Sequence, residues 1–396
     1  MNEETRPATP TKLQLSSTDT LVKSAISSIT FYCDAMKRQH NAAVAGQIEP
    51  VHQLRVSSRR LRAAIELFSG VLYASALKIY RRDIPWIAGE AGAVRNCDVL
   101  EELFKERAAK LDVTLRNALG PIIEAIVAER KAAHTLLVQE LSSKRYSALM
   151  GKLSSPPVKT ARGRAKLGIA APDLVGPMVR GIRKKGKKLA EDAPPEIFHK
   201  LRVRIKRLRY ALDMLAPLAG KHHRKTLMRL EEMQELLGAY NDTVVAIGWL
   251  HSFAATSGAP PATILAAGGL IHSLGARARK LMRQGLKAWQ RFERSGVLDD
   301  AVLEFNDTAE DLADAERKAV RLAAEQARAS AQEAASDSQV APLPGASVAS
   351  AADPVTDVSQ PADPPGSSTA LVVIENAEPQ GDAPSPPKSD DTEHAA

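Results

Sequence analysis

Aromatic residues make up only 4% of the 396-residue chain, and no stretch shows the strict apolar–polar alternation of a half-buried strand. Because sheets are enriched in aromatic and β-branched side chains, this scarcity argues against a sheet protein. Abundant Ala and Leu favour helices, and a hydrophobic content of 44% is enough for a packed interior. The composition therefore predicts an all-α protein.

Cysteine, long apolar runs and recognisable catalytic motifs are also scarce or missing. The two cysteines, Cys33 and Cys97, form no C-x-x-C pair, which favours a reducing cytoplasm over an oxidising compartment. No run of about 18 apolar residues exists, and the N-terminal residues lack an apolar core, so we expect neither a membrane span nor a signal peptide. We find no nucleophile elbow, Walker loop or dinucleotide fingerprint, and expect no catalytic residue and no cofactor.

Positive charge is concentrated in the first four fifths of the chain. The net charge is +8, but residues 326–396 carry eleven acidic and two basic residues, so that residues 1–325 carry +17. An excess of this size favours a polyanionic partner. A surface charge that only aids solubility is the alternative.

Composition and periodicity predict a series of helices, and divide the chain into six segments. We expect helices at about 18–46, 50–73, 75–108, 112–150, 174–191, 195–216, 221–254, 260–293 and 297–328. Residues 151–173 are rich in Pro, Gly and Ser, and the tail in Ala, Pro and Ser, which suits a linker and a disordered segment. The predicted order is a disordered N-terminus (1–16), a first helical half (17–150), a basic linker (151–173), a second half (174–293), a C-terminal helix (294–328) and a disordered acidic tail (329–396). Within the tail, the apolar residues 370–377 are either a docking motif or, as we favour, a chance cluster.

The two halves repeat one pattern. The stretch VHQLRVSSRRLRAAIELF at 51–68 returns as FHKLRVRIKRLRYALDML at 198–215, with the two histidines 147 positions apart. Downstream, Gly92-Ala93 returns as Gly238-Ala239, 146 positions on. Two matches with nearly equal offsets indicate an internal duplication, and hence two helical halves of similar design.

Each repeated stretch predicts a helix with an apolar back and a basic face. At about 100° per residue, the basic side chains of each copy fall within about 80° of one another, opposite a row of Leu, Ile and Phe. The basic faces comprise His52, Arg55, Arg59 and Arg62 in the first copy, and His199, Arg202, Lys206 and Arg209 in the second. Like charges at this spacing repel, so a basic face without interspersed acids suits a bound row of phosphates.

The function of the repeated histidines and acids stays open at this point. His52 and His199 fit a helix-start histidine bonded to a neighbour, an anion contact or, least well, a metal ligand, because arginines surround them and no ligand spacing accompanies them. We therefore expect no metal. Asp98 and Asp242 fit either surface carboxylates or groups that orient the basic side chains.

A further basic run, VRGIRKKGKKL at 179–189, adds Arg183, Lys184 and Lys187 to the predicted polyanion surface. The basic faces of the repeated stretches carry a single aromatic, Tyr210, which weakens the case for base stacking on single-stranded nucleic acid. A phosphate chain without bases has no need of such stacking.

These stretches, together with GAVRNCDVLEELF, LLGAYNDTVVAI and KAWQRF, resemble the CHAD (conserved histidine α-helical domain) family over about residues 17–293. The resemblance implies two four-helix bundles around a basic groove or pore, binding of inorganic polyphosphate, and location at polyphosphate granules. It places the anion-binding positions at His52, Arg55, Arg59, Arg60, Arg62, His199, Arg202, Arg204, Lys206, Arg207 and Arg209. The chain departs from the family at Asn96-Cys97-Asp98, where the usual pattern is Asp-x-Asp, and it lacks the Glu-x-Glu-x-Lys motif of the triphosphate-cleaving domains fused to some members.

Three functional hypotheses follow. The leading one is a non-catalytic polyphosphate-binding protein of the cytoplasm, located at granules, whose acidic tail contacts granule proteins. The second is a hydrolase of phosphate chains that uses His or Asp in acid–base roles. The third is a general polyanion-binding protein, on nucleic acid or on a storage-granule surface.

Overall fold

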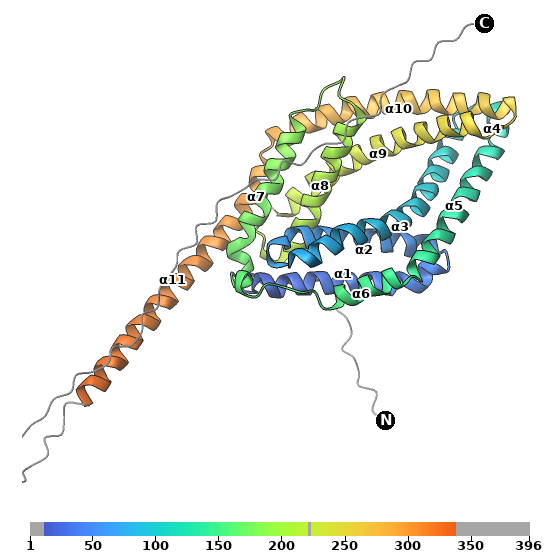
Figure 1. The fold of residues 1–396 in the computed structure, drawn as a ribbon. Helices are drawn as coiled ribbons and strands as arrows, with labels where there is room; N and C mark the ends of the chain where they lie inside the picture. The colour runs from blue at the N-terminus through green and yellow to red at the C-terminus, as the bar shows by residue number, and fades with distance from the viewer. Residues whose placement is uncertain (1–11, 221–222, 338–396) are drawn as a thin grey trace, which may run out of the picture. The chain divides into compact units, whose positions relative to one another are not determined.

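The structure is a computed structural model that describes residues 12–220 and 223–337, and these residues form helices without a strand (Figure 1). The all-α prediction is confirmed. The α-helices are α1 (Leu21–Val44), α2 (Ile48–Leu67), α3 (Ala74–Ala108), α4 (Val113–Asn117), α5 (Gly120–Leu141), α6 (Lys144–Ser154), α7 (Leu167–Gly186), α8 (Pro195–Leu215), α9 (His223–Thr256), α10 (Pro261–Arg294) and α11 (Val297–Asp337). Short 3₁₀ helices are η1 (Ser69–Val71), η2 (Ala161–Gly163) and η3 (Ala216–Leu218). None of the described helices is long and apolar enough to cross a bilayer.

The helices pack in the same order in both halves of the chain. In the first half α1 packs on α2, α2 on α3 and α3 on α5; in the second, α7 packs on α8, α8 on α9 and α9 on α10. Figure 1 shows these pairs following one another, with α1 and α2 opposite α9 and α10. This recurrence agrees with the predicted pair of four-helix bundles and is consistent with an internal duplication.

Two separate apolar cores hold the bundles together. The larger includes residues of α1, α2, α6, α7 and α8, together with α3 up to Val94, α9 up to Tyr240 and the end of α10. The smaller is formed by the second half of α3, the start of α5, the second half of α9 and the first half of α10. The long helices α3 and α9 therefore pass from one core to the other, which fixes their middle turns between the two.

Three helices replace the single one that the sequence predicts over 112–150. Asp112 caps α4 by accepting from the backbone N–H groups of Thr114 and Leu115, and Ser143 caps α6 by accepting from that of Tyr146. Local side-chain caps of this kind end one helix and start the next without disturbing the apolar periodicity. Prolines stand in the first turn of two helices, since α5 begins at Gly120-Pro121 and α8 at Pro195.

The ordered region extends further at its edges than the predicted boundaries. In the predicted N-terminal disordered segment, Leu13 and Leu15 pack on the larger core. Leu21 N donates to Ala165 O, and Leu167 N to Asp19 O, so the chain before α1 lies beside the start of α7. Helix α7 begins at Leu167, inside the predicted linker, because Leu167, Ala171 and Val175 are buried at helical spacing.

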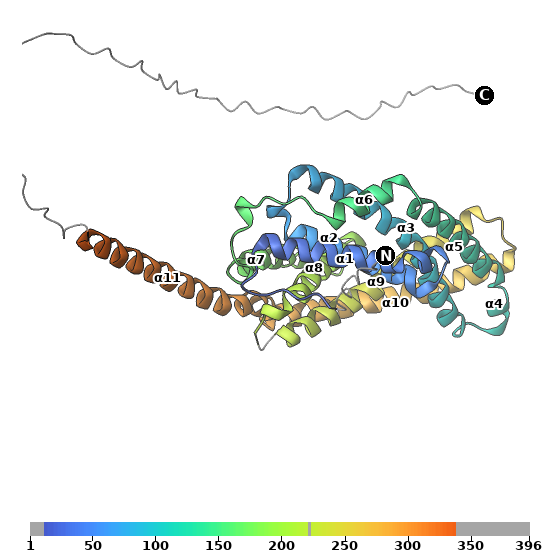
Figure 2. The ribbon, with the colours of Figure 1, turned by 90° about the horizontal axis from the view of Figure 1, so that it is seen from below.

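Helix α11 is anchored at its beginning and exposed beyond. Val297, Leu298, Ala301 and Phe305 are buried in the larger core, whereas residues 317–332 are all exposed. Figure 2 shows the exposed part leading away from the other helices. The helix continues to Asp337, past the predicted end at 328, because residues 326–337 contain strong helix formers and neither Gly nor Pro. The remaining predicted tail, with residues 370–377, and residues 1–11 lie outside the described residues.

Packing of α7 on α10 generates a stability test. A methyl group added at Gly186, the buried last residue of α7, overlaps the indole ring of Trp289 on α10. We expect Gly186→Ala to lower the free energy of unfolding by about 1–3 kcal/mol or more, measured by denaturant unfolding, because the core cannot expand without strain.

The matched control is Gly248→Ala on α9, where an added methyl meets no atom within 4 Å. It should leave stability unchanged or raise it by about 0.5–1 kcal/mol, since alanine favours the helix. Equal effects at both positions would show that α7 and α10 do not pack as described.

Candidate polyanion-binding site

Helices α2 and α8 have the two-sided character that the repeated sequence predicts. On α2, Leu54 and Leu61 are at most 1% exposed and belong to the larger core. On α8, Leu201, Leu208 and Leu212 are 0% exposed and do the same. The basic side chains of both helices lie on the other side and are half-buried or exposed. The apolar backs thus fix both helices, and with them the direction of their charges.

The two basic faces meet, because α2 and α8 pack against each other. Five half-buried cations from the two helices lie close together, since charges among them lower the pKa values of Arg55, Arg59 and Lys206. We call them the central cluster: Arg55, Arg59, Arg202, Lys206 and Arg209. All five are among the sequence-predicted site residues. The structure therefore brings together residues that lie in different halves of the chain.

Burial and the charges of their neighbours depress the pKa values of Arg55, Arg59 and Lys206. Burial, followed by the charges of Arg59, Arg202, Arg55 and Arg209, lowers the pKa of Lys206 to about 7. Burial, then Arg59 and Arg202, lowers the pKa of Arg55 to about 10. The pKa of Arg59 is lowered chiefly by burial and partly restored by Tyr210 and Asp242. A cation is disfavoured wherever neighbouring charges of the same sign outweigh the available acids, and the cluster is therefore short of negative charge.

The middle turns of α3 and α9 line the same region. On α3, Arg95 and Asn96 lie between Val94, in the larger core, and Cys97, in the smaller core. On α9, Asn241 and Asp242 lie between Tyr240 and Ala246, which belong to the larger and smaller core respectively. Polar residues occupy the points where both helices leave one core and enter the other. The central cluster is thus positioned between two apolar cores.

The repeated Gly-Ala pairs have a structural function that the sequence did not reveal. A methyl group at Gly92 would lie 3.4 Å from Arg55 Nε, and one at Gly238 would lie 3.6 Å from Arg202 Nε. Each glycine thus lets the arginine of its own half lie against the neighbouring long helix. Any side chain larger than a methyl group would displace that arginine.

Few acceptors oppose the central cluster, and they differ between the halves. Arg55 Nη2 lies 3.5 Å from Asn96 Oδ1, whereas Arg202 Nη2 lies 3.9 Å from Asp242 Oδ1. Arg209 donates to Gln234 Oε1 at 3.0 Å and also contacts Glu231. Among the described residues, no ion pair is recorded for Arg55, Arg59 or Lys206. The first half supplies an amide where the second supplies a carboxylate.

Three neighbouring hollows open beside the central cluster. One of about 260 Å³ lies between α2 and α8, with Met178 of α7 and Tyr210 in its wall. Two of about 420 Å³ each share Arg204 and Arg207. Arg207 borders all three, so the hollows adjoin one another beside α8, and together we call them the basic groove.

The repeated histidines occupy different environments. His199 is exposed in the basic groove, and its Nδ1 lies 2.6 Å from Asn241 Oδ1. Because that oxygen only accepts, Nδ1 carries a proton, and Nε2 remains for another partner. Burial, and then Arg95, lower the pKa of His52, whose Nδ1 finds no hydrogen-bond partner within residues 12–220 and 223–337. His199 is thus hydrogen-bonded to α9, while His52 lies among cations.

The remaining predicted cations of α2 and α8 differ in availability. Arg62, Arg204 and Arg207 are exposed and line the basic groove. Arg60 instead lies 3.8 Å from Asp213 Oδ2, with its guanidinium 6.0 Å from the ring centre of Tyr210. Arg60 therefore links α2 to α8 through partners of its own.

In the basic run at 179–189, the residue that lines the groove is not one of the three predicted from the sequence. Arg183 donates to Asp299 Oδ2 at 2.6 Å, so its charge is matched by α11. Lys184 and Lys187 are exposed, and neither lines the hollows described above. Lys185 does line the groove, as does Lys200 of α8. Arg95, on α3, is a further cation that the repeat pattern alone did not identify.

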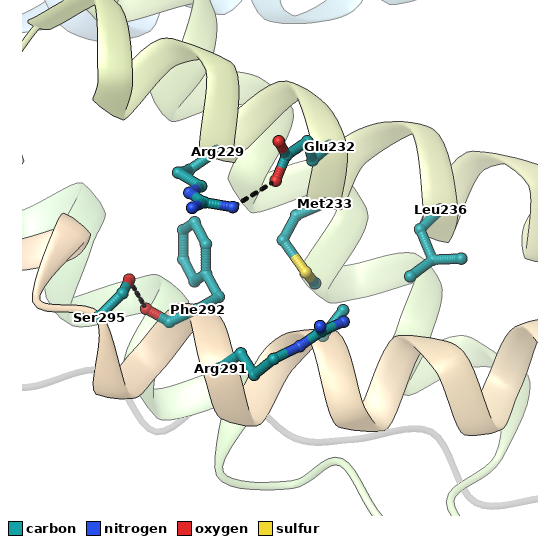
Figure 3. Close-up of a pocket in the computed structure, with 8 residues that line it drawn as sticks. Arg229, Glu232, Met233, Leu236, Arg291, Phe292 and Ser295 are labelled. Carbon is teal, nitrogen blue, oxygen red and sulfur yellow. Dashed lines mark hydrogen bonds and ion pairs between the residues drawn. The ribbon is translucent and has the colours of Figure 1, made fainter.

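A separate hollow of about 400 Å³ lies between α9 and α10 and contains none of the repeated basic residues. Figure 3 shows Arg229 of α9 and Phe292 of α10 in its wall, with Arg229 paired to Glu232 at 3.0 Å. Since Arg229 already has an acidic partner, this hollow lacks the excess of cations found at the basic groove. Within the described residues, no three His, Cys, Asp or Glu side chains gather in a metal-binding group.

The two acids left open by the sequence have different functions, and a pair of substitutions tests this. Asp98 is buried and accepts from Arg130 Nε at 2.6 Å, which ties α3 to α5. Asp242 is 43% exposed and lies near Arg202. We expect Asp98→Asn to lower the free energy of unfolding by about 2 kcal/mol. Asp242→Asn should change it by less than about 1 kcal/mol. Equal losses in denaturant unfolding would contradict this division.

Comparison with known proteins identifies the fold. A family model described as CHAD domain matches residues 28–251. The crystal structure of the CHAD domain from the plant Ricinus communis is 27% identical, with a TM-score of 0.59 over 70% of this chain and 96% of that one. PptA from Streptomyces chartreusis, at 20% identity, shares the fold with a TM-score of 0.57 over 69% of this chain and 100% of its own. No curated protein matches. Because the family model covers more than half of the sequence, this chain belongs to the CHAD domain family.

Proposed function

We propose that the chain binds inorganic polyphosphate in the basic groove, through the central cluster and the exposed cations beside it, without cleaving the polymer. The observation that carries this proposal is the deficit of negative charge between α2 and α8. Phosphate oxygens in the groove would supply that charge and form charge-assisted hydrogen bonds with the guanidinium groups.

The shape of the groove supports a thin chain in preference to a duplex. The cations of the central cluster are half-buried between two helices, whereas a nucleic-acid duplex presents its phosphates on a wide, convex surface. Tyr210 is 6% exposed and already stacks near Arg60 and Arg209, so it offers no open face to a base. An unbranched phosphate polymer fits both conditions.

The arrangement of acids supports binding rather than hydrolysis. Hydrolysis of a phosphate chain needs a group that activates water or a metal that does so. The basic groove is lined by two carboxylates, Glu66 and Asp173. Glu66 is held by Arg81, which lowers the pKa of its carboxyl group, and Asp242, beside the central cluster, lies near Arg202. Among the described residues Asp173 is thus the single groove carboxylate that no arginine engages. Sustained release of phosphate from polyphosphate, with or without a divalent cation, would contradict the proposal.

A double substitution tests the central cluster. We expect Arg55→Gln/Arg202→Gln to weaken the binding of long-chain polyphosphate at least tenfold per arginine, about 1.4 kcal/mol each. The slope of log affinity against log salt concentration should fall by about 2, because two phosphate contacts are lost. Isothermal titration at several salt concentrations measures both quantities.

The matched control is Arg229→Gln/Arg291→Gln, which removes the same charge from the α9–α10 hollow. This variant should keep most of the affinity and the salt slope. If the two double variants bind alike, attraction is spread over the whole surface and the basic groove is not the site.

Competition between polymers separates polyphosphate from nucleic acid. We expect long-chain polyphosphate to displace duplex DNA of matched phosphate concentration from the protein, because only the thinner chain reaches the half-buried cations. Equal affinity for both would favour the general polyanion hypothesis instead. Polyphosphate binding would also carry the protein to cytoplasmic polyphosphate granules, which imaging of a labelled chain in cells with and without the polymer would test.

A further inference from the structure

The basic groove contains one half-buried lysine in a cluster of arginines. Lys206 lines the 260 Å³ hollow and lies at the position that corresponds, 147 residues on, to Arg59 of the first half. An arginine keeps its charge in a protein, whereas the amine of a buried lysine can lose its proton. The two copies of this position thus hold Arg59, whose charge is permanent, and Lys206, whose charge depends on pH.

The surroundings of Lys206 offer the amine little compensation. Several groups share its hollow or act through their charges on Lys206 or Arg55. They are, from α2, Arg55, Arg59, Arg62 and Glu66, from α3, Arg95, from α8, His199, Arg202, Arg207, Arg209 and Tyr210, and, from α9, Asp242, while α7 contributes the apolar Met178. Both carboxylates lie near arginines, as described above. No hydrogen bond or ion pair of the Lys206 amine is recorded among the described residues. Burial and these charges lower the pKa of Lys206 to about 7, so the amine is largely neutral in the empty groove above that pH.

We propose that Lys206 couples the binding of a phosphate chain to the uptake of a proton, so that the groove holds the chain more tightly as the pH falls toward neutrality. The inference rests on the proposed function and adds a regulation of the same site. A phosphate chain beside Lys206 replaces repulsion by attraction and favours the charged amine. Above pH 7 the amine must then gain a proton when the chain binds, and the proton comes from solvent.

The sign of the pH dependence follows from this linkage. Below about pH 7, Lys206 is charged in both the free and the bound protein, and contributes no dependence on pH. Above pH 7 the free protein loses the proton and the complex retains it, so affinity falls by up to tenfold per pH unit for one proton. His52 titrates below this window, because its pKa is lowered from 6.5.

Titration calorimetry with long-chain polyphosphate at pH 8, in two buffers of different ionisation enthalpy, counts the protons taken up on binding. We expect the wild-type chain to take up nearly one proton more than Lys206→Arg, which is charged at every pH used. Between pH 7 and pH 9 the dissociation constant of the wild type should rise tenfold or more beyond that of Lys206→Arg. Any protonation of the polymer itself is common to both proteins and cancels.

A second variant is needed in case the larger side chain of Lys206→Arg does not fit the hollow between α2 and α8. Lys206→Met is neutral throughout, so it should bind more weakly than wild type at pH 7, by a margin that narrows toward pH 9, and take up no extra proton. Lys225→Arg, at an exposed position of α9, should behave as wild type. Equal proton uptake and equal pH dependence in wild type and both Lys206 variants would overturn the inference. Failure of every protein to bind at any pH would instead overturn the proposed function.

Discussion

Contact between two helices of like charge is the constraint on which this structure depends. Helices α2 and α8 pack against each other with half-buried cations on their facing sides, and repulsion alone would separate them. The apolar backs of both helices prevent this, because they are part of one continuous core. Hydrophobic burial therefore holds a set of charges in a geometry that is unfavourable in the empty protein and favourable around an anion. The same burial raises the strength of each charge–phosphate contact by excluding water.

The division of the fold into two cores places the site. Helices α3 and α9 cross from one core to the other at Arg95-Asn96 and Asn241-Asp242, where polar side chains can face the gap without interrupting either core. The halves have diverged within this frame, since Asn96 opposes Arg55 while Asp242 opposes Arg202. The pair Arg59 and Lys206 differs in the same way. A duplicated scaffold thus carries a site whose two sides are chemically unequal.

The helices and the basic faces could be predicted because they depend on local periodicity. The 3.6-residue spacing of Leu54, Leu61 and Ile65 fixes the buried side of α2, and the opposite side follows. Which cations remain without an acid could not be predicted, because the partners of Arg60 and Arg183, Asp213 and Asp299, lie far along the chain. The duplication indicated that α2 and α8 correspond, but only their packing shows that the two faces meet. The starts of α4 and α6 depend on single capping side chains, Asp112 and Ser143, and α5 begins with Pro121 in its first turn. Apolar periodicity does not reveal such breaks.

A crystal structure of the chain with a short polyphosphate tests the central claim most directly. We expect phosphate groups between α2 and α8, in contact with guanidinium groups of both helices and with the Lys206 amine, and little movement of either helix, because the cores already fix them. Phosphate bound instead at the α9–α10 hollow or along exposed surface lysines, with the central cluster untouched, would contradict the account.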